Sequence, residues 1–276
     1  MDVKNLNLRD EPSELQKQLI TNVCKEVINF DSRKVILNWG QSGSGKTRIA
    51  YYFENNLSTI LDISDDNFFH AYVNIPIDGQ DANKEIIKNI FDNLSIRKIK
   101  REISATIKEI GKEELLERVN NKIRSKNFND TIIHLSKDIF PIIAFQQYVF
   151  DGFSSKELKK IGLSKSLKTN EDYKIFLAAI IVAIVSGKSD KKFILWLDRV
   201  ENMVHYYNSQ QFKVMAQLFG YLVDRIDENF LVFLNFTCTG DLDSVRLSLG
   251  DELWSRIDKK IRFQISSVDT KEIPHV

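Results

Sequence analysis

The 276-residue sequence predicts an α/β fold in which helices cover both faces of a parallel sheet. Two observations support this prediction. Short runs rich in branched and aromatic residues alternate with longer segments whose apolar residues recur three and four apart. In addition, a glycine-rich stretch, GQSGSGKT at residues 40–47, joins the first apolar run to a helical segment.

The elements can be assigned in chain order. A first helix is expected over residues 12–29. Further helices are expected over 46–56, over 78–94 and over 209–226, between the runs that predict strands. The five predicted strands are residues 35–39, 71–77, 193–197, 230–236 and 261–265.

The strands are interrupted by a helical block at residues 95–170, with breaks at Gly111, Pro141 and Gly152. We therefore expect a first part of the main domain at 1–94, the insertion at 95–170 and the rest of the domain at 171–276. Residues 95–126 hold ten Lys or Arg and five Glu. This cluster predicts either a DNA or RNA contact or an ordinary solvated helix face.

Composition excludes several classes of protein. The 39 basic and 38 acidic side chains give no overall attraction to nucleic acid or acidic lipid. The longest apolar run, 175–185, is much shorter than the roughly 20 residues of a membrane span and predicts a buried helix. The polar N-terminus is unlike a signal peptide, and Cys24 and Cys238 fit no metal spacing. We expect a soluble cytoplasmic protein.

The stretch GQSGSGKT matches the phosphate-binding pattern G-x-x-x-x-G-K-[ST] through Gly40, Gly45, Lys46 and Thr47. Glycines let successive backbone N–H groups converge on an anion, and the helix that follows adds its positive end. Lys46 is expected to reach the terminal phosphates, and the Thr47 hydroxyl to bind Mg²⁺. The expected nucleotide contacts are Gly40, Gln41, Ser42, Gly43, Ser44, Gly45, Lys46, Thr47 and Arg48.

A second Mg²⁺ ligand is predicted in FILWLDRVENM, where Asp198 follows a buried run. An aspartate there can also cap the next helix, which is compatible with the metal role. The next residue is Arg199, which cannot accept a proton at neutral pH. Glu201, one helical turn on, is the candidate for activating water; a solvated helix glutamate is the alternative.

Two later segments are candidates to complete the site. The run FLVFLNFTCTGD ends in Asn235, Thr237 and Thr239, any of which can point at a terminal phosphate or only cap the loop. Arg256 precedes the last strand. It is predicted either as an arginine finger for a neighbouring subunit or as a surface ion pair.

In this order, the motifs resemble those of AAA+ and related STAND ATPases, with the origin-recognition-like branch and the ATPases of bacterial anti-phage and DNA-modification systems most similar. GQSGSGKT corresponds to Walker A, FILWLDRVEN to Walker B, FLNFTCTG to sensor 1, and LWSRIDKKIRF to the region of the arginine finger. The resemblance covers residues 12–265. It implies a five-stranded P-loop NTPase sheet of the ASCE type, with the sensor strand between the Walker strands. It also implies ATP as ligand, since no guanine-reading N-K-x-D occurs, and homo-oligomers or larger complexes that act on DNA.

The sequence departs from this family in two places. Arg199 stands where a glutamate is usual, while an acidic residue three positions after the aspartate fits the STAND pattern. ISSVDTKEIPHV resembles only the start of a helical lid, so we expect an incomplete C-terminal lid. The resulting hypothesis is an ATPase that drives assembly or conformational change. The alternatives are a nucleotide-gated scaffold with little turnover and, less favoured, a P-loop kinase.

Overall fold

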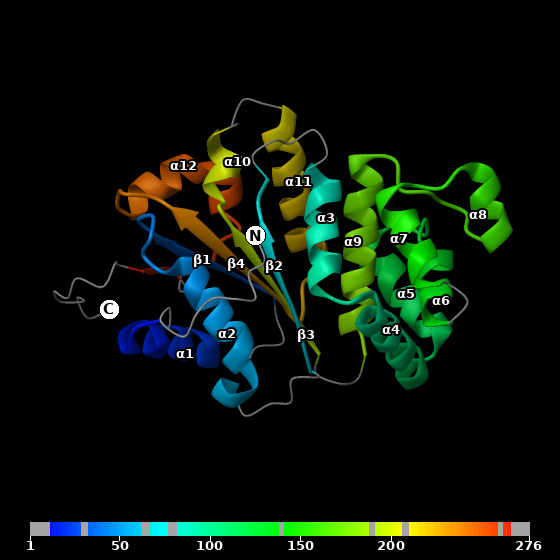
Figure 1. Cartoon of the computed structure of the whole chain (residues 1–276), viewed down its shortest axis with the longest axis horizontal. Helices are drawn as coiled ribbons and strands as arrows, with labels where there is room; N and C mark the ends of the chain where they lie inside the picture. Colours follow the sequence, from blue (N-terminus) through cyan, green and yellow to red (C-terminus); the bar gives the residue numbers. More distant parts are fainter. Residues whose placement is uncertain are drawn as a thin grey trace.

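The computed structural model describes residues 12–28, 33–61, 67–76, 82–137, 141–187, 191–205, 210–258 and 262–265. Its centre is a sheet with strand order β2-β3-β4-β1-β5 (Figure 1). All its strand pairs are parallel, which confirms the predicted α/β class. Strand β4 lies between β1 and β3, as the resemblance implied. Four strands have seven or eight residues, and the fifth has three: β1 (Lys34–Gly40), β2 (Phe68–Asn74), β3 (Lys192–Asp198), β4 (Phe230–Thr237) and β5 (Arg262–Gln264).

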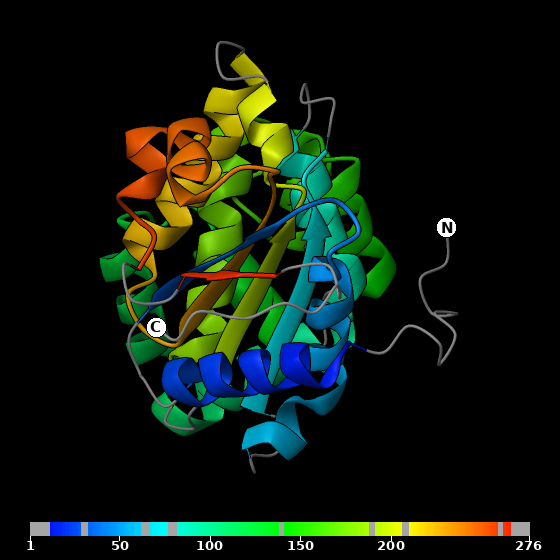
Figure 2. The same cartoon turned by 90° about the vertical axis from the view of Figure 1, so that its left-hand side faces the viewer.

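The sheet separates two hydrophobic cores, one on each face, because successive residues of a strand point to opposite sides. On one face, helices α1 (Glu14–Ile28) and α2 (Lys46–Leu61) cover a core that contains Trp196 and Phe233. These two rings are stacked with centroids 3.9 Å apart. Figure 2 shows α1 in front of the sheet and the green helices of the insertion behind it.

The helices of residues 82–185 cover the other face and extend beyond it, to the right in Figure 1. Buried side chains from the sheet and from these helices form one continuous core, so the inserted helices share their packing with the sheet. They are α3 (Ala82–Asn93), α4 (Ile96–Ile110), α5 (Lys112–Ile123), α6 (Asn129–Ser136), α7 (Ile142–Phe150), α8 (Ser155–Ile161) and α9 (Asn170–Val185).

The predicted breaks fall between helices. Gly111, at φ 88°, separates α4 from α5, Pro141 caps the start of α7, and Gly152 follows its end. The apolar run 175–185 lies in α9 and is almost entirely buried, as predicted. No helix in the described ranges is long and apolar enough to cross a membrane.

The boundaries of other elements differ from the prediction. Strand β2 begins at Phe68 and ends at Asn74, earlier than predicted, since Pro76 has no N–H to continue the ladder. Helix α2 runs on to Leu61. The remaining helices are α10 (Glu201–His205), α11 (Gln210–Arg225) and α12 (Leu242–Trp254). The segment expected to open a lid, 266–276, lies outside the described residues.

Candidate nucleotide-binding site

The loop between β1 and α2 needs glycine at several positions. Gly43 and Gly45 have φ of 79° and 99°, a region that other residues rarely adopt. A Cβ on Gly40 would lie 2.2 Å from the backbone oxygen of Ile265, next to β5. The loop is therefore packed closely against the edge strand, and it leads directly into the N-terminus of α2.

Helix α1 contacts this loop through Gln16, a residue that the sequence analysis did not single out. The buried Gln16 amide donates from Nε2 to the carbonyl oxygen of Ser44 over 2.9 Å. Its Oε1 accepts from the backbone N–H of Ser13 at 3.1 Å, which fixes the orientation of the side chain. A polar residue in an amphipathic helix gives no sequence signal for such a long-range contact.

Lys46 is buried inside the loop. Its Nζ donates to the carbonyl oxygens of Gly40 and Gln41 at 2.9 and 2.8 Å. Burial lowers the pKa of Lys46, while the carboxylates of Glu201 and Asp198 oppose that shift. Both predicted acidic groups therefore act on the lysine that is expected to meet the phosphates.

Asp198 lies at the end of β3, directly beside the start of α2. Its Oδ2 accepts a hydrogen bond of 2.9 Å from the Thr47 hydroxyl, so the two predicted Mg²⁺ ligands are in contact. The same oxygen accepts a hydrogen bond from the Tyr72 hydroxyl of β2. Burial, followed by the negative charge of Asp198, raises the pKa of Tyr72 well above its ordinary value. No sequence pattern indicated this third partner.

Glu201 reaches the same site by a sharp turn of the chain after β3. Arg199 has a left-handed φ of 58°, and the Val200 N–H donates to the carbonyl oxygen of Asn235 at 3.1 Å. Helix α10 then begins at Glu201. The Glu201 carboxylate accepts a hydrogen bond of 2.9 Å from the backbone N–H of Thr237, at the end of β4.

These groups surround a cavity of about 690 Å³, within the size range of small-molecule sites. Three cations and two carboxylates lie on its wall, a mixture suited to a polyanion that arrives with a metal ion. The lining residues are Ser42, Gly43, Gly45, Lys46, Thr47, Arg48, Asp198, Arg199, Glu201, Asn202 and Thr237.

Two predicted catalytic residues lie elsewhere. Asn235 is fully buried inside the sheet, where its Oδ1 accepts a hydrogen bond of 2.8 Å from the side-chain amide of Asn38. Arg256 donates to both carboxylate oxygens of Asp224, at 3.3 and 2.9 Å, and so joins the end of α12 to α11. Such a surface ion pair is the alternative role that the sequence predicts for Arg256. Of the three polar residues considered at the end of β4, only Thr237 lines the cavity.

The residues present fit a nucleotide with Mg²⁺. The positive-φ glycines turn the loop around the helix N-terminus, which is a geometry that binds anions. Thr47 and Asp198 offer the hard oxygen ligands that Mg²⁺ prefers. Among the described residues, no group of three or more His, Cys, Asp or Glu could hold a metal. Any Mg²⁺ here would therefore take its further ligands from outside the described residues, as water or phosphate oxygens.

The parallel sheet, the glycine loop and the Thr47–Asp198 pair define a site of the P-loop class. No family model and no curated protein matches this chain. Among solved structures, it is similar to a Walker-type ATPase of Pyrococcus abyssi, with 13% identity and a TM-score of 0.39. The match covers 92% of this chain and 53% of that chain, so this chain spans about half the length of that ATPase.

Proposed function

We propose that this chain is a Mg²⁺-dependent P-loop ATPase that uses the cavity at the ends of β1 and β3. One observation carries the proposal: the 2.9 Å contact between the Thr47 hydroxyl and the Asp198 carboxylate, with Lys46 buried beside them. Residues separated by 151 positions are thereby brought together in the arrangement that binding of a Mg²⁺–triphosphate requires.

Each group of the chain has a distinct role in this proposal. The loop N–H groups and the start of α2 bind the phosphate oxygens. Lys46 supplies positive charge at the terminal phosphates, and Thr47 and Asp198 hold the metal. When bound, Mg²⁺ neutralises charge on the phosphates. Arg48 and Arg199 add positive charge to the wall of the cavity.

Glu201 is the proposed water-activating carboxylate. It lines the cavity, and its bond to the Thr237 N–H fixes the side chain relative to the sheet. A carboxylate held in this way can accept a proton from a water molecule that attacks the terminal phosphate. If Glu201 does not perform this step, the chain is a nucleotide-gated scaffold that binds ATP with little turnover.

Nucleotide binding is the first test. Binding of fluorescent ATP and GTP analogues to the purified chain is measured with Mg²⁺, for the wild type and for Lys46→Ala. We expect the wild type to prefer the ATP analogue and the variant to lose at least about tenfold in affinity, because a charge contact to phosphate is removed. Failure of the wild type to bind either nucleotide would refute the proposal.

Single-turnover hydrolysis is the second test. We expect Glu201→Gln to bind ATP normally and to slow the chemical step by about 100-fold or more, the typical contribution of a general base. Glu113→Gln, the same change at an exposed glutamate of α5 outside the cavity, serves as the matched control. Tight binding without measurable turnover by the wild type would favour the scaffold instead.

We also propose that nucleotide binding drives homo-oligomerisation. The resemblance to AAA+ and STAND proteins supports this assembly. On the same ground we propose nucleic-acid handling, a role in phage defence and a cytoplasmic location. An Arg256 finger would first have to leave Asp224. Gel filtration with and without a non-hydrolysable ATP analogue tests assembly, and Arg256→Ala tests whether the finger contributes. A monomer under both conditions would exclude the assembly proposal.

A further inference from the structure

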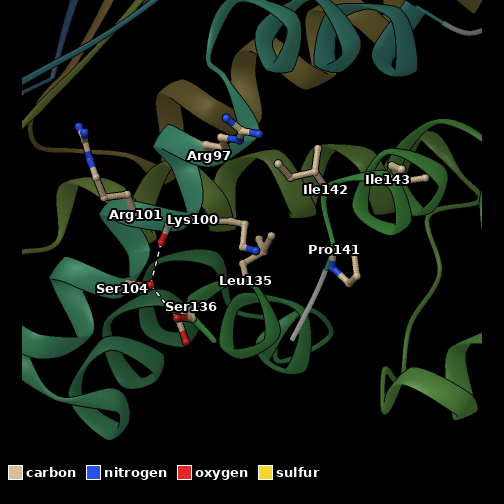
Figure 3. A pocket seen from close by; sticks show the side chains of 9 residues that line it. All are labelled: Arg97, Lys100, Arg101, Ser104, Leu135, Ser136, Pro141, Ile142 and Ile143. Carbon is tan, nitrogen blue, oxygen red and sulfur yellow. Dashed lines mark hydrogen bonds between the residues drawn. The ribbon is translucent and has the colours of Figure 1, made fainter. Parts of the chain in front are cut away.

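A second cavity, of about 850 Å³, lies between α4, α6 and the start of α7 (Figure 3). We call it the α4–α7 cleft. It is open to solvent and lies within the inserted helices, separate from the nucleotide cavity. Its lining residues are Arg97, Lys100, Arg101, Ser104, Leu135, Ser136, Pro141, Ile142 and Ile143.

One wall of the cleft is cationic. Arg97, Lys100 and Arg101 share one face of α4 because they are three and four residues apart. None of the nine lining residues is acidic. The nearest acid on α4, Glu102, is buried and accepts hydrogen bonds from Lys191 at 2.6 Å and from Arg101 at 2.8 Å. Glu102 is thus engaged outside the cleft, and the nine described lining residues include three basic side chains and no acidic one.

The opposite wall is aliphatic. Pro141, Ile142 and Ile143 lie across from the α4 side chains in Figure 3, and Leu135 lies beside Lys100. The Ile143 side chain is 71% exposed, although large apolar residues of the described chain are mostly buried. Together with Pro141 and Ile142 it forms a contiguous apolar wall bordered by basic side chains, a combination found at binding grooves.

The two serines contribute little recognition of their own. Ser104 Oγ donates to the carbonyl oxygen of Ser136 at 2.6 Å, and Ser136 Oγ donates to that of Ile133 at 2.7 Å. Both hydroxyl protons are therefore directed at the backbone. Specificity in the cleft must come from the cations and the aliphatic wall.

This combination fits a peptide better than a nucleic acid. None of the nine described lining residues is aromatic, whereas single-stranded nucleic acids are usually bound by stacking on aromatic side chains. Contacts to phosphates alone need no aliphatic wall. We propose that the α4–α7 cleft binds a segment of a partner protein in which two or more carboxylates flank an aliphatic side chain. The carboxylates pair with Arg97 and Lys100, and the aliphatic group packs on Ile142 and Ile143.

The cleft and the nucleotide cavity lie at opposite ends of the sheet, so the two sites can be tested separately. Lys98 of α4 donates to the carbonyl oxygen of Phe68, at the start of β2, while Asp198 ends β3. Strand β3 has seven residues, so Lys192 at its start and Asp198 at its end lie roughly 20 Å apart. Variants of the cleft should leave nucleotide binding intact, and failure of the ATPase proposal would leave the cleft proposal standing.

The test is a display selection of random 12-residue peptides on the full chain, followed by anisotropy measurements on a fluorescent copy of the most enriched peptide. We expect enrichment of Asp and Glu around Leu, Ile, Val or Met. Arg97→Glu and Ile143→Ser should each weaken the selected peptide by about tenfold or more, the loss typical of a central interface contact. The matched controls, Lys112→Glu and Leu247→Ser, change an exposed lysine and an 83% exposed leucine outside the cleft and should stay within about twofold.

The fluorescent nucleotide analogue or, if it does not bind, thermal melting confirms that each variant is folded. The proposal is overturned if no acidic–aliphatic sequence is enriched, or if the selected peptide binds Arg97→Glu or Ile143→Ser as tightly as the wild type. It is also overturned if a 20-nucleotide single strand displaces the peptide and itself binds Ile143→Ser as tightly as the wild type. That pattern identifies a phosphate-binding surface.

Discussion

Tyr72 offers the sharpest test of how the metal site is built. Its hydroxyl donates to the Asp198 oxygen that also accepts from Thr47. Tyr72→Phe removes this donor and keeps the ring, which packs against Tyr51 with centroids 4.9 Å apart. The change therefore acts on the orientation of the carboxylate and leaves the core filled.

The expected magnitude follows from the contacts that remain. A hydrogen bond to a charged group contributes about 1.5–3 kcal/mol, equivalent to roughly a 10- to 100-fold change. Because Thr47 still donates to the same oxygen at 2.9 Å, we expect the lower end of this range. Loss of a group that orients a metal ligand commonly weakens metal affinity by about tenfold or more.

The assay is a Mg²⁺ titration of the fluorescence of a bound ATP analogue. We expect the half-saturating Mg²⁺ concentration of Tyr72→Phe to rise about tenfold. Binding in EDTA should stay as in the wild type, since no phosphate contact is removed. Burial and Asp198 raise the pKa of Tyr72, so the phenol remains a protonated donor through neutral and mildly alkaline pH. The shift should therefore be the same at pH 7 and pH 8.5.

Tyr51→Phe is the control, because it removes a neighbouring phenol and preserves the aromatic contact. A Mg²⁺ midpoint for Tyr72→Phe within twofold of the wild type would refute the orienting role. If Tyr72→Phe lowers nucleotide affinity equally with Mg²⁺ and in EDTA, the variant perturbs the structure of the phosphate loop and not the metal site.

Three further predictions concern stability. Gly40→Ala places a Cβ 2.2 Å from the Ile265 backbone oxygen, and urea denaturation should show a loss of about 1–3 kcal/mol together with weaker nucleotide binding. Lys191→Met leaves the buried Glu102 with Arg101 alone and should lower the free energy of unfolding by about 3 kcal/mol; an unchanged denaturation midpoint would contradict this. Burial acts to raise the pKa of Glu102, but hydrogen bonds from Lys191 and Arg101 outweigh it and place that pKa below its ordinary 4.5. The stability that this carboxylate contributes is thus present above pH 4.5 and is lost as the pH falls through its lower pKa in the folded state. Glu102→Gln should therefore flatten that part of the acid denaturation profile.

Local patterns allowed much of the fold to be predicted from the sequence. The phosphate loop, the buried run of α9 and the breaks at Gly111 and Pro141 each depend on residues close together in the chain. Contacts between distant segments left no such signal. Gln16 and Tyr72 are one polar and one aromatic residue in elements that look ordinary, and only the packing of α1 and β2 brings them to the loop and to Asp198.

The path of the backbone distinguishes the roles of Arg199 and Glu201, the two residues weighed after the Asp198 carboxylate. The Asp198 carbonyl oxygen accepts from the Ile75 N–H, and the Val200 N–H donates to Asn235, so both flanking residues are fixed to neighbouring strands. Between them Arg199 takes a left-handed φ and its side chain is exposed. The side chain that returns to the end of β4 is Glu201, which accepts from the Thr237 N–H. In this geometry the carboxylate that is fixed against the sheet comes from the third position after Asp198, while the first position places a cation on the wall of the cavity.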